Sequence, residues 1–331
     1  MASAAGTTAA TTGGDEKWMV FGRTGWLGGK LIKMLEAEGK AVVGAKSRLE
    51  NRSDVAAELD EVKPTHVLNA AGLTGRPNVD WCEDHKEEVL RVNVIGTMSL
   101  LDLCNQRKIH VTNYATGCIY SYDEEHPMGG KTFTEEDEPN FTGSFYSYTK
   151  GLVEKLQKTY DNVLVLRVRM PISDDLSPRN FITKICKYRR VVNIPNSMTI
   201  LTEMLPYSIL MARKQLTGVY NFTNPGAISH NEILELYKKY IDPKFWYENF
   251  TEEEQNKILK AGRSNNELDT TKIQAAVPEV ELVHIQKAIV GVFERMAANL
   301  KAAGTLPPPP FKMGNSPEEF DKLAAEAKAS K

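Results

Sequence analysis

Short apolar runs alternate with longer amphipathic stretches through most of the chain. Runs rich in Val, Ile and Leu predict buried strands at 17–22, 40–46, 65–71, 109–115, 162–168 and 219–223. Apolar positions at helical spacing predict helices at 26–39, 51–61, 83–107 and 145–160, from about 180, and at 230–240 and 284–301. Strands that alternate with helices indicate βαβ units. We therefore expect an α/β fold with a doubly wound parallel sheet.

The two ends of the chain differ from this alternating region. Residues 1–16 are rich in Ala, Thr and Gly, and we expect them to be disordered. Residues 305–331 contain four consecutive prolines, which predict an extended linker followed by a charged tail. Between the ends we expect a sheet core at 17–170, with a later return to the sheet near 218–224. The intervening and following residues, 171–304, are expected to form mainly a second, smaller region.

Composition and charge narrow the classes of function. The 331 residues are 41% hydrophobic and 25% charged, which is ordinary for a globular protein of about two domains. Forty-one basic and 43 acidic residues give a net charge of -2, which argues against nucleic-acid and membrane-surface binding. No apolar stretch is long enough for a membrane span, and the N-terminus does not read as a secretory signal, so a cytoplasmic location is expected. The four cysteines lack metal-binding spacing and are expected to be reduced thiols, without a metal.

A glycine-rich turn follows the first predicted strand. The segment Gly22-Arg-Thr-Gly25-Trp-Leu-Gly28 opens the first helix, where glycines permit a tight turn and close approach of a pyrophosphate to the helix N-terminus. The alternative is an ordinary strand–helix connection. The position in the first βαβ unit favours a dinucleotide site within 17–170. The expected cofactor contacts in this turn are Gly22, Thr24, Gly25, Trp26, Leu27 and Gly28.

The end of the second predicted strand bears on the choice of cofactor. An NAD site places an acidic residue there to bind the ribose 2′-hydroxyl. This chain has Gly44-Ala-Lys46-Ser-Arg48 instead, and Lys46 and Arg48 can bind a 2′-phosphate. The alternative is a pair of solvated surface charges. We predict NADPH as the cofactor, with Arg48 as a contact.

Tyr146 and Lys150 form a YxxxK pair on a predicted helix. Positions i and i+4 share one helix face, so Tyr146 can protonate a carbonyl oxygen while the Lys150 ammonium lowers the tyrosine pKa. Thr116, at the end of an earlier strand, is expected to hydrogen-bond the same substrate oxygen. The alternative for Thr116 is a loop residue that caps the backbone.

In their order along the chain, these residues resemble the extended short-chain dehydrogenase/reductase family, over roughly 17–300. The resemblance is carried by the glycine turn, Asn69-Ala70-Ala71-Gly72, Asn93, Thr116 and the Tyr146/Lys150 pair. It implies a Rossmann fold, cofactor contacts from Ala70 and Ala71, and Tyr146 as the proton donor. It also implies that Lys150 binds the nicotinamide ribose and that Asn93 supports the active-site relay.

A second acid–base pair is predicted beside the first. Reductases of 4-keto-6-deoxy sugars usually carry Thr-Asp-Tyr where this chain has Thr116-Gly-Cys118, and in an extended chain Cys118 shares a side with Thr116. Sugar nucleotide 3,5-epimerases of the resembled fold use a Cys there and supply a Lys from the region of Lys184. We therefore expect Cys118 and Lys184 to exchange protons with the sugar. The alternatives are a small buried hydrophobe and a solvated helix lysine.

Longer stretches resemble plant-type nucleotide-rhamnose synthases, the epimerase-reductases of this family. They are 75–83, 138–147, 166–173, 194–201 and 218–226. The resemblance implies conversion of UDP- or dTDP-4-keto-6-deoxy-glucose to the β-L-rhamnose nucleotide with NADPH. It also implies a substrate supplied by a separate 4,6-dehydratase, because the chain has one dinucleotide fingerprint. The helices expected at 83–107 and 145–160 are a candidate homodimer interface.

Three residues are implied as substrate contacts. They are Arg76, Asn180 at the place where the family holds the diphosphate, and Arg263 in the segment Arg263-Ser-Asn-Asn-Glu-Leu-Asp269. That segment resembles a signature of dTDP-4-dehydrorhamnose reductases, with Ser264 in place of the usual Pro.

Other activities compete with this prediction. A GDP-L-fucose synthase-like epimerase-reductase would use the same chemistry on another nucleotide, and a GDP-mannose 3,5-epimerase would use only part of it. A non-catalytic NADP-binding regulatory subunit would need neither acid–base pair. The joint presence of Cys118, Lys184, Tyr146 and Lys150 favours an enzyme.

Overall fold

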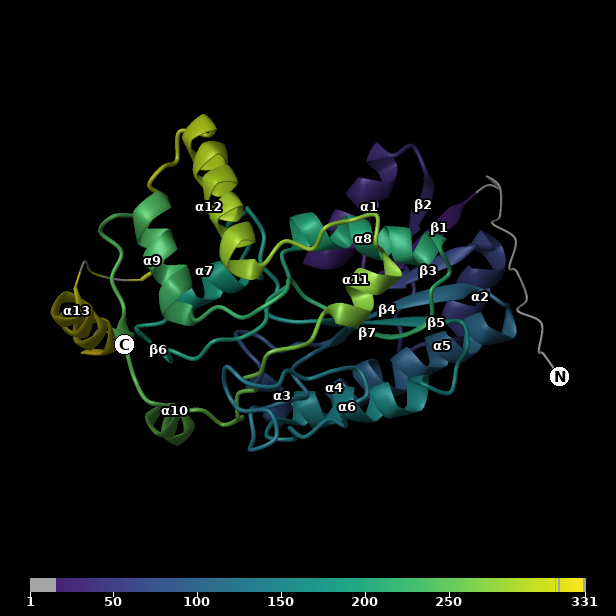
Figure 1. Ribbon diagram of the computed structural model, residues 1–331, viewed down its shortest axis with the longest axis horizontal. Helices are drawn as coiled ribbons and strands as arrows, with labels where there is room; N and C mark the ends of the chain where they lie inside the picture. The colour runs from purple at the N-terminus through teal and green to yellow at the C-terminus, as the bar shows by residue number, and fades with distance from the viewer. Residues whose placement is uncertain (1–15, 313, 315, 330–331) are drawn as a thin grey trace.

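A six-stranded parallel sheet forms the centre of the larger lobe in the computed structural model, which describes residues 16–312, 314 and 316–329 (Figure 1). The strand order is β2-β1-β3-β4-β5-β7. The strands are β1 Lys17–Phe21, β2 Ala41–Gly44, β3 His66–Asn69, β4 His110–Thr116, β5 Val163–Val168 and β7 Gly218–Phe222. The predicted doubly wound α/β fold is confirmed. The chain reverses its direction of travel across the sheet between β1 and β3, where such folds bind ligands.

Helices cover both faces of the sheet because each strand sends alternate side chains to opposite sides. In β1, Trp18 and Val20 pack with α1 (Trp26–Ala37), α8 (Leu201–Arg213) and α11 (Thr271–Ala276). Met19 and Phe21 pack in the opposite core with α2 (Arg52–Val62) and α5 (Thr97–Gln106). Helix α6 (Phe145–Gln157) lies beside α5 (Figure 1). Strand β1 is thus buried on both sides.

The helices differ from the sequence prediction in several places, and α10 (Glu252–Ile258) and α11 were not predicted. The expected helix at 83–107 is divided: a short α3 (Trp81–Asp84) ends at His85, and the chain then runs through α4 (Lys86–Val89) and a π-helical segment, Leu90–Gly96, into α5. Helix α8 was not predicted, because Pro206 lies inside it. The burial of its apolar face against the sheet outweighs the lost hydrogen bond.

The smaller lobe has a core of its own. It is formed by α7 (Phe181–Cys186), α9 (His230–Tyr240) and α12 (Ile285–Ala302), with the short strands β6 (Arg190–Val191) and β8 (Glu248–Asn249) and helix α10 (Glu252–Ile258) nearby (Figure 1). Within residues 171–304, the elements α8, β7 and α11 belong to the sheet lobe rather than to this core. The chain crosses between the lobes more often than we expected.

The ends of the chain are only partly described. Residues 1–15 of the segment expected to be disordered lie outside the described residues, while Glu16 pairs with Lys40 and Arg213. The proline-rich segment is not a free linker: Lys312 is 8% exposed, and its ammonium lies 4.2 Å from the centre of the Phe245 ring. It leads into α13 (Pro317–Ala329). None of the described helices combines the length and apolar character needed to cross a bilayer.

Candidate active site

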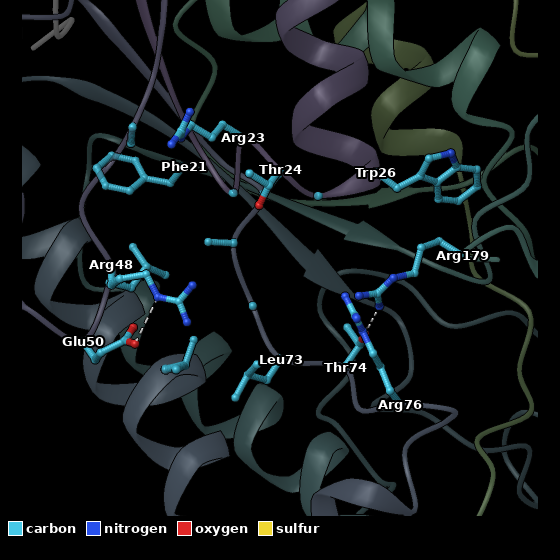
Figure 2. Close-up of a pocket in the computed structure, with 18 of the residues that line it drawn as sticks. Phe21, Arg23, Thr24, Trp26, Arg48, Glu50, Leu73, Thr74, Arg76 and Arg179 are labelled. Carbon is cyan, nitrogen blue, oxygen red and sulfur yellow. Dashed lines mark hydrogen bonds and ion pairs between the residues drawn. The ribbon is translucent and has the colours of Figure 1, made fainter. Parts of the chain in front are cut away.

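A cavity of about 760 Å³ opens where β1, β2 and β3 end (Figure 2). Most of the predicted cofactor residues line it, namely Gly22, Thr24, Gly25, Trp26, Arg48, Ala70 and Ala71. The predicted substrate residue Arg76 also lines it. Leu27, Gly28 and Lys150 are not among the lining residues. The cavity therefore coincides with the predicted dinucleotide site.

The glycine turn is built for close backbone contact. Gly22 has φ +82°, and a Cβ there would lie 2.8 Å from the Ala70 carbonyl carbon. A Cβ on Gly28 would lie 2.3 Å from the Gly22 carbonyl oxygen, so Gly28 allows the turn to close rather than lining the cavity. Gly25 precedes the first turn of α1, whose free backbone N–H groups suit a phosphate. These features fit a bound dinucleotide.

Basic side chains lie at the end of β2, where the 2′-phosphate that distinguishes NADPH from NADH would bind. The Arg48 side chain is 76% exposed, and its Nε lies 3.4 Å from Glu50 Oε1 on one wall of the cavity (Figure 2). Glu58 accepts hydrogen bonds from the Lys46 and Ser47 backbone N–H groups at 2.8 Å, which anchors this loop.

Two residues at this end were missed by the sequence prediction. Arg23 also lines the cavity and lies so close to Gly44 that a Cβ at position 44 would be 2.9 Å from Arg23 Cβ. Its position inside the glycine motif was the available signal. Glu50 lines the cavity as well, six residues beyond β2 rather than at its end.

The opposite wall of the cavity carries two more cations. Arg76 was predicted, whereas Arg179 was missed; Arg179 donates a hydrogen bond to Thr74 Oγ1 at 3.3 Å (Figure 2). Burial, and then the charge of Arg76, lower the pKa of Arg179, as expected when two guanidinium groups share one wall. An anionic ligand between them would relieve this repulsion.

Asn180 does not line the cavity. Its side chain is fully buried, accepts a hydrogen bond from the Ile182 N–H, and donates to the carbonyls of Ser173 and Asp175. The Asp175 carboxylate in turn binds Lys30 at 2.7 Å. The polar atoms of the Asn180 side chain thus hydrogen-bond protein groups and hold this loop against α1, an arrangement that favours an indirect role over the predicted contact with substrate.

Arg263 is likewise held by protein groups. Its Nη1 lies 2.9 Å from Asp80 Oδ1 and 2.7 Å from the Ala261 carbonyl. About a quarter of the side chain remains exposed. Arg263 thus ties the loop after α10 to the segment that precedes α3.

Four of the predicted site residues come together from the end of β4, the start of α6 and helix α7. Thr116 ends β4; its hydroxyl accepts the Cys118 N–H at 3.1 Å, and it lies close enough to Tyr146 to act on the pKa of that side chain. Cys118 raises the pKa of both Tyr146 and Lys184, so the three groups are within electrostatic reach of one another. Thr116, Cys118, Tyr146 and Lys184 therefore form one cluster. This cluster was assembled from three separate segments of the sequence.

The protonation of this cluster differs from our expectation. Burial, followed by the Cys118 thiol, raises the pKa of Tyr146, while the Thr116 hydroxyl lowers it less. The expected lowering of the Tyr146 pKa by Lys150 is therefore wrong for this structure, because burial dominates. Burial lowers the pKa of Lys150 to about 8, against the opposing effect of Glu154. Burial and Arg179 lower the pKa of Lys184.

The turn that carries Cys118 is held by residues distant in sequence. Arg169 Nη1 lies 3.4 Å from the Cys118 sulfur and 3.1 Å from Ser264 Oγ. The Ser264 hydroxyl donates to the Tyr120 carbonyl, and Asn266 Nδ2 donates to the Gly117 and Tyr120 carbonyls at 3.0 and 2.9 Å. A proline at position 264 could form neither side-chain bond. The replacement that set this segment apart from the reductase signature thus has a structural role.

Asn93 lies in the π-helical segment and is 1% exposed. Its amide accepts the Leu73 N–H and donates to the Leu73 carbonyl, both at 2.8 Å. Leu73 lines the cavity. Asn93 therefore fixes the loop after β3 at the boundary between the cavity and the cluster.

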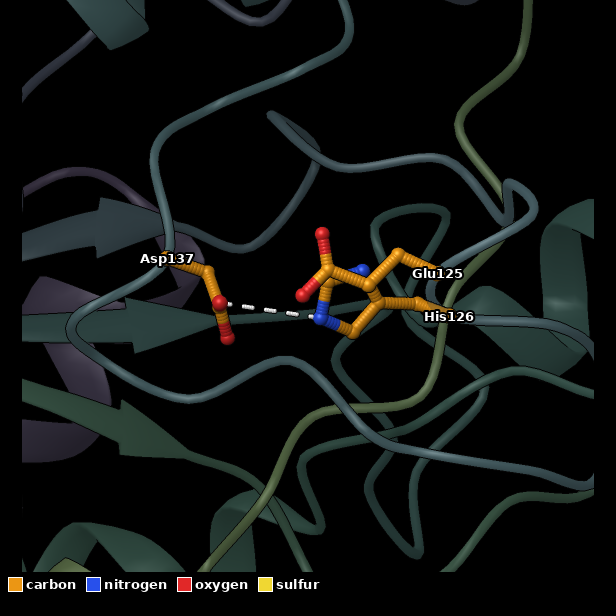
Figure 3. A group of neighbouring side chains, drawn as sticks. All are labelled: Glu125, His126 and Asp137. Carbon is orange, nitrogen blue, oxygen red and sulfur yellow. Dashed lines mark ion pairs between the residues drawn. The ribbon is translucent and has the colours of Figure 1, made fainter.

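A second group of ionisable side chains lies elsewhere, in the long loop after β4 (Figure 3). The donor atoms of Glu125, His126 and Asp137 lie within 4.8 Å of one another. Each has a protein partner: Glu125 pairs with Lys131 at 2.6 Å, His126 stacks on Phe133 at 4.0 Å, and Asp137 accepts two hydrogen bonds from Thr134. These contacts give the group a role in holding the loop together.

Comparisons with known proteins bear on this site. A family model described as the RmlD substrate binding domain matches residues 16–297. The chain is 58% identical over 280 residues to a bifunctional dTDP-4-dehydrorhamnose 3,5-epimerase/dTDP-4-dehydrorhamnose reductase of Arabidopsis thaliana, covering 84% of this chain and 92% of that protein. It is 57% identical to a trifunctional UDP-glucose 4,6-dehydratase/UDP-4-keto-6-deoxy-D-glucose 3,5-epimerase/UDP-4-keto-L-rhamnose-reductase of the same plant, covering 83% of this chain and 41% of the longer one.

Solved structures give the same picture of the fold. The crystal structure of the L780 UDP-rhamnose synthase from Acanthamoeba polyphaga mimivirus superposes with a TM-score of 0.80 at 43% identity, covering 85% of this chain and all of that one. A dTDP-4-dehydrorhamnose reductase from Bacillus anthracis in complex with NADP has a TM-score of 0.71 at 17% identity, which shows a shared fold.

Proposed function

The chain belongs to the RmlD substrate-binding domain family, and from that membership we propose that it is an NADPH-dependent 3,5-epimerase/4-reductase of nucleotide sugars. It converts UDP- or dTDP-4-keto-6-deoxy-glucose to the β-L-rhamnose nucleotide. The observation that carries the proposal is the cluster that brings Thr116 and Tyr146 together with Cys118 and Lys184. The proton donor of the reduction, Tyr146, thus lies beside the pair proposed for the epimerisation, Cys118 and Lys184. The names of the plant and viral relatives support this activity.

The cofactor end fits NADPH. The pyrophosphate would rest on the glycine turn at the start of α1, and Arg48, Arg23 and Lys46 would take the 2′-phosphate at the end of β2. Lys150 would hold the nicotinamide ribose. When bound, NADPH supplies the hydride that reduces carbon 4 of the sugar.

The protein residues divide the remaining chemistry between two steps. The 4-keto group acidifies the hydrogens on carbons 3 and 5, and Cys118 and Lys184 remove and return protons on opposite faces of the sugar. Tyr146 then donates its proton to the oxygen on carbon 4 while Thr116 holds that oxygen. The raised Tyr146 pKa keeps this proton in place until the oxygen develops negative charge. One ketone serves both steps, so one pocket suffices.

The diphosphate of the substrate would lie between the two arginines on the far wall of the cavity. Arg76 and Arg179 are placed for this, and Arg263 would contribute from the loop after α10. Asn180 would act indirectly, by holding the loop that precedes Arg179.

We further propose a homodimer formed through α6. Tyr148, Leu152 and Leu156 expose apolar surface at a spacing of four residues along this helix, and Leu90 and Ile95 do so on the neighbouring segment. Such a stripe suits a partner helix, and a sedimentation experiment that finds only monomers at micromolar concentration would contradict it. The 4,6-dehydratase that makes the substrate is proposed to act as a separate protein, although the trifunctional relatives carry that activity in their own longer chains.

The test is to incubate the protein with NADPH and UDP-4-keto-6-deoxy-glucose and to identify the sugar by NMR. The dTDP analogue and GDP-4-keto-6-deoxy-mannose serve as alternative substrates. We expect the L-rhamnose nucleotide from the UDP or dTDP substrate. A sugar that is reduced but keeps the D configuration would indicate a simple reductase, and turnover of the GDP sugar alone would indicate the fucose-type enzyme.

A further inference from the structure

Arg169 is a buried cation without a carboxylate partner among the described residues. It follows β5 directly and is fully buried. Its hydrogen bonds to oxygen go to neutral groups, namely the Gly117 carbonyl, the Ser264 hydroxyl and carbonyl, and the Asn196 side-chain oxygen. A guanidinium stays protonated in proteins, and a buried charge is costly unless an opposite charge accompanies it. A negatively charged group close to Arg169 would therefore stabilise this buried charge.

The neighbouring Arg167 differs from Arg169, because it is equally buried but has a carboxylate partner. Arg167 lies two residues earlier and is equally buried, but its Nε and Nη2 lie 3.0 and 2.6 Å from the two Glu154 carboxylate oxygens. Its positive charge is balanced within the protein. Arg169 has no such carboxylate, and its Nη1 lies 3.4 Å from the Cys118 sulfur instead.

Cys118 is the group near Arg169 that can supply the missing negative charge. Tyr122 and His230 also face Arg169, but burial raises the pKa of Tyr122 to about 12 and lowers the pKa of His230 to about 4, so both are neutral near pH 7. Tyr146 and Lys184 face Cys118 from α6 and α7. Burial raises the pKa of Tyr146, so it too stays neutral, and Lys184 is a base that carries no negative charge in either form.

We propose that Arg169 is a positioning residue of the epimerisation step, which fixes the Cys118 sulfur and carries the positive charge that pairs with its thiolate. This inference rests on the proposed function and assigns the two partners different parts. The Cys118 thiolate takes the proton from carbon 3 or 5, and the electron pair of the broken C–H bond moves into an enolate on the keto oxygen. The Lys184 ammonium then delivers a proton to the opposite face of the same carbon. Proton exchange with solvent restores the thiolate and the ammonium before the second carbon reacts.

The test measures the alkylation of Cys118 by iodoacetamide as a function of pH, in the full chain without substrate or NADPH. Cys118 is the half-exposed cysteine, whereas Cys82, Cys104 and Cys186 are buried, and a Cys118→Ser variant gives their background. The variants are Arg169→Met, which removes the charge, and Arg169→Lys, which keeps it. Lys187→Met is the matched control, because Lys187 is an exposed lysine that caps the C-terminus of the helix of Lys184.

The alkylation midpoint of the wild type is the reference with which the variants are compared. Arg169→Met should raise the midpoint by one unit or more, which is about a tenfold loss of rate at neutral pH. Arg169→Lys should recover part of the shift, and Lys187→Met should match the wild type. If Arg169→Met folds poorly, the wild type provides a second test of the inference. At pH 7 it should show thiolate absorbance that the Cys118→Ser variant lacks.

No thiolate absorbance in the wild type, or an unshifted midpoint in folded Arg169→Met, would overturn the inference. The alkylation is read without substrate, so it is independent of the proposed activity. A shifted midpoint in a protein that makes no rhamnose nucleotide would reject the activity and keep the role of Arg169. Normal synthesis of the rhamnose nucleotide with an unshifted midpoint in Arg169→Met would keep the proposed activity and reject the role of Arg169.

Discussion

The two ends of the site are built in different ways. At the cofactor end, the cavity is lined by a glycine turn and by largely exposed cations such as Arg48. At the sugar end, Cys118 and Thr116 are held by buried side chains that hydrogen-bond one another, including Arg169 and Ser264. The first end depends on backbone shape, and the second depends on side chains from segments far apart in sequence.

This difference predicts where function and stability are coupled. Replacing an exposed side chain at the cofactor end should change affinity and leave the fold unchanged, because surface substitutions have small effects on stability. Replacing a buried polar side chain near the sugar end should change both, because its partners are left unsatisfied in a dry environment. The predictions below test that difference, from the largest expected effect to the smallest.

Tyr146→Phe should separate the two chemical steps at the sugar end. The variant lacks the proton donor, so NADPH oxidation should fall by roughly 10²–10⁴-fold. Cys118 and Lys184 remain, and deuterium from solvent should still enter carbons 3 and 5 of the keto sugar. Mass spectrometry of the recovered substrate checks this. Loss of exchange in a folded variant that still binds NADPH would show that the two acid–base pairs do not act independently.

Glu154→Gln should destabilise the fold strongly. It leaves Arg167 buried without its counter-charge, and breaking a buried ion pair in this way costs about 3–5 kcal/mol. Urea unfolding measures the change. Glu138→Gln, which removes an exposed partner of Lys155 near the same helix, is the control and should leave the free energy of unfolding nearly unchanged. Equal losses for the two variants would contradict the distinction between buried and exposed charges.

Arg48→Ala should weaken NADPH binding by roughly tenfold and leave the free energy of unfolding nearly unchanged, because an exposed charge-assisted contact to phosphate is lost. NADH binding should hardly change, since NADH has no 2′-phosphate. Fluorescence titration with both cofactors measures the affinities. A wild type that binds the two cofactors equally would reject the role assigned to Arg48.

Lys150→Met should alter how stability depends on pH. Burial lowers the folded-state pKa of Lys150 to about 8, below its unfolded value near 10.5. Above pH 8 the unfolded chain therefore binds the extra proton, and this residue adds stability as the pH rises from 8 towards 10.5. Relative to Lys150→Met, the wild type should gain about 1 kcal/mol between pH 7 and 9. Parallel curves for the two proteins would show that Lys150 is not strained by burial.

The same contrast explains how far the sequence predicts the structure. The periodicity of strands and helices located the sheet, and the Gly22–Gly28 motif located the cavity. Each of these signals is made of residues that lie close together in the sequence. The grouping of Thr116 with Tyr146 was predicted from the YxxxK pair and from a threonine at the end of a strand, and the family resemblance includes the same residues. Helix α8 was missed because its signal conflicts with Pro206, and tertiary packing decided the outcome.

The sugar end contains what the sequence could not predict. Arg169 meets Ser264 across 95 positions, and Asn266 meets Gly117 across 149, and no spacing rule links such distant residues. For Arg167 and Arg169, the local sequence signal was the presence of two charged residues at the end of an apolar strand. The same holds for Asn180. An asparagine at this position is able to bind a ligand, but its buried side chain hydrogen-bonds the neighbouring loop, and only the structure shows this.

The most direct test of the central claim is to run the complete reaction in deuterium oxide with unlabelled NADPH. If one chain both epimerises and reduces the sugar, the L-rhamnose nucleotide should carry deuterium at carbons 3 and 5 and hydrogen at carbon 4. NMR of the product reads all three positions at once. A reduced sugar with hydrogen at carbons 3 and 5, or deuterated keto sugar with no reduced product, would contradict the account.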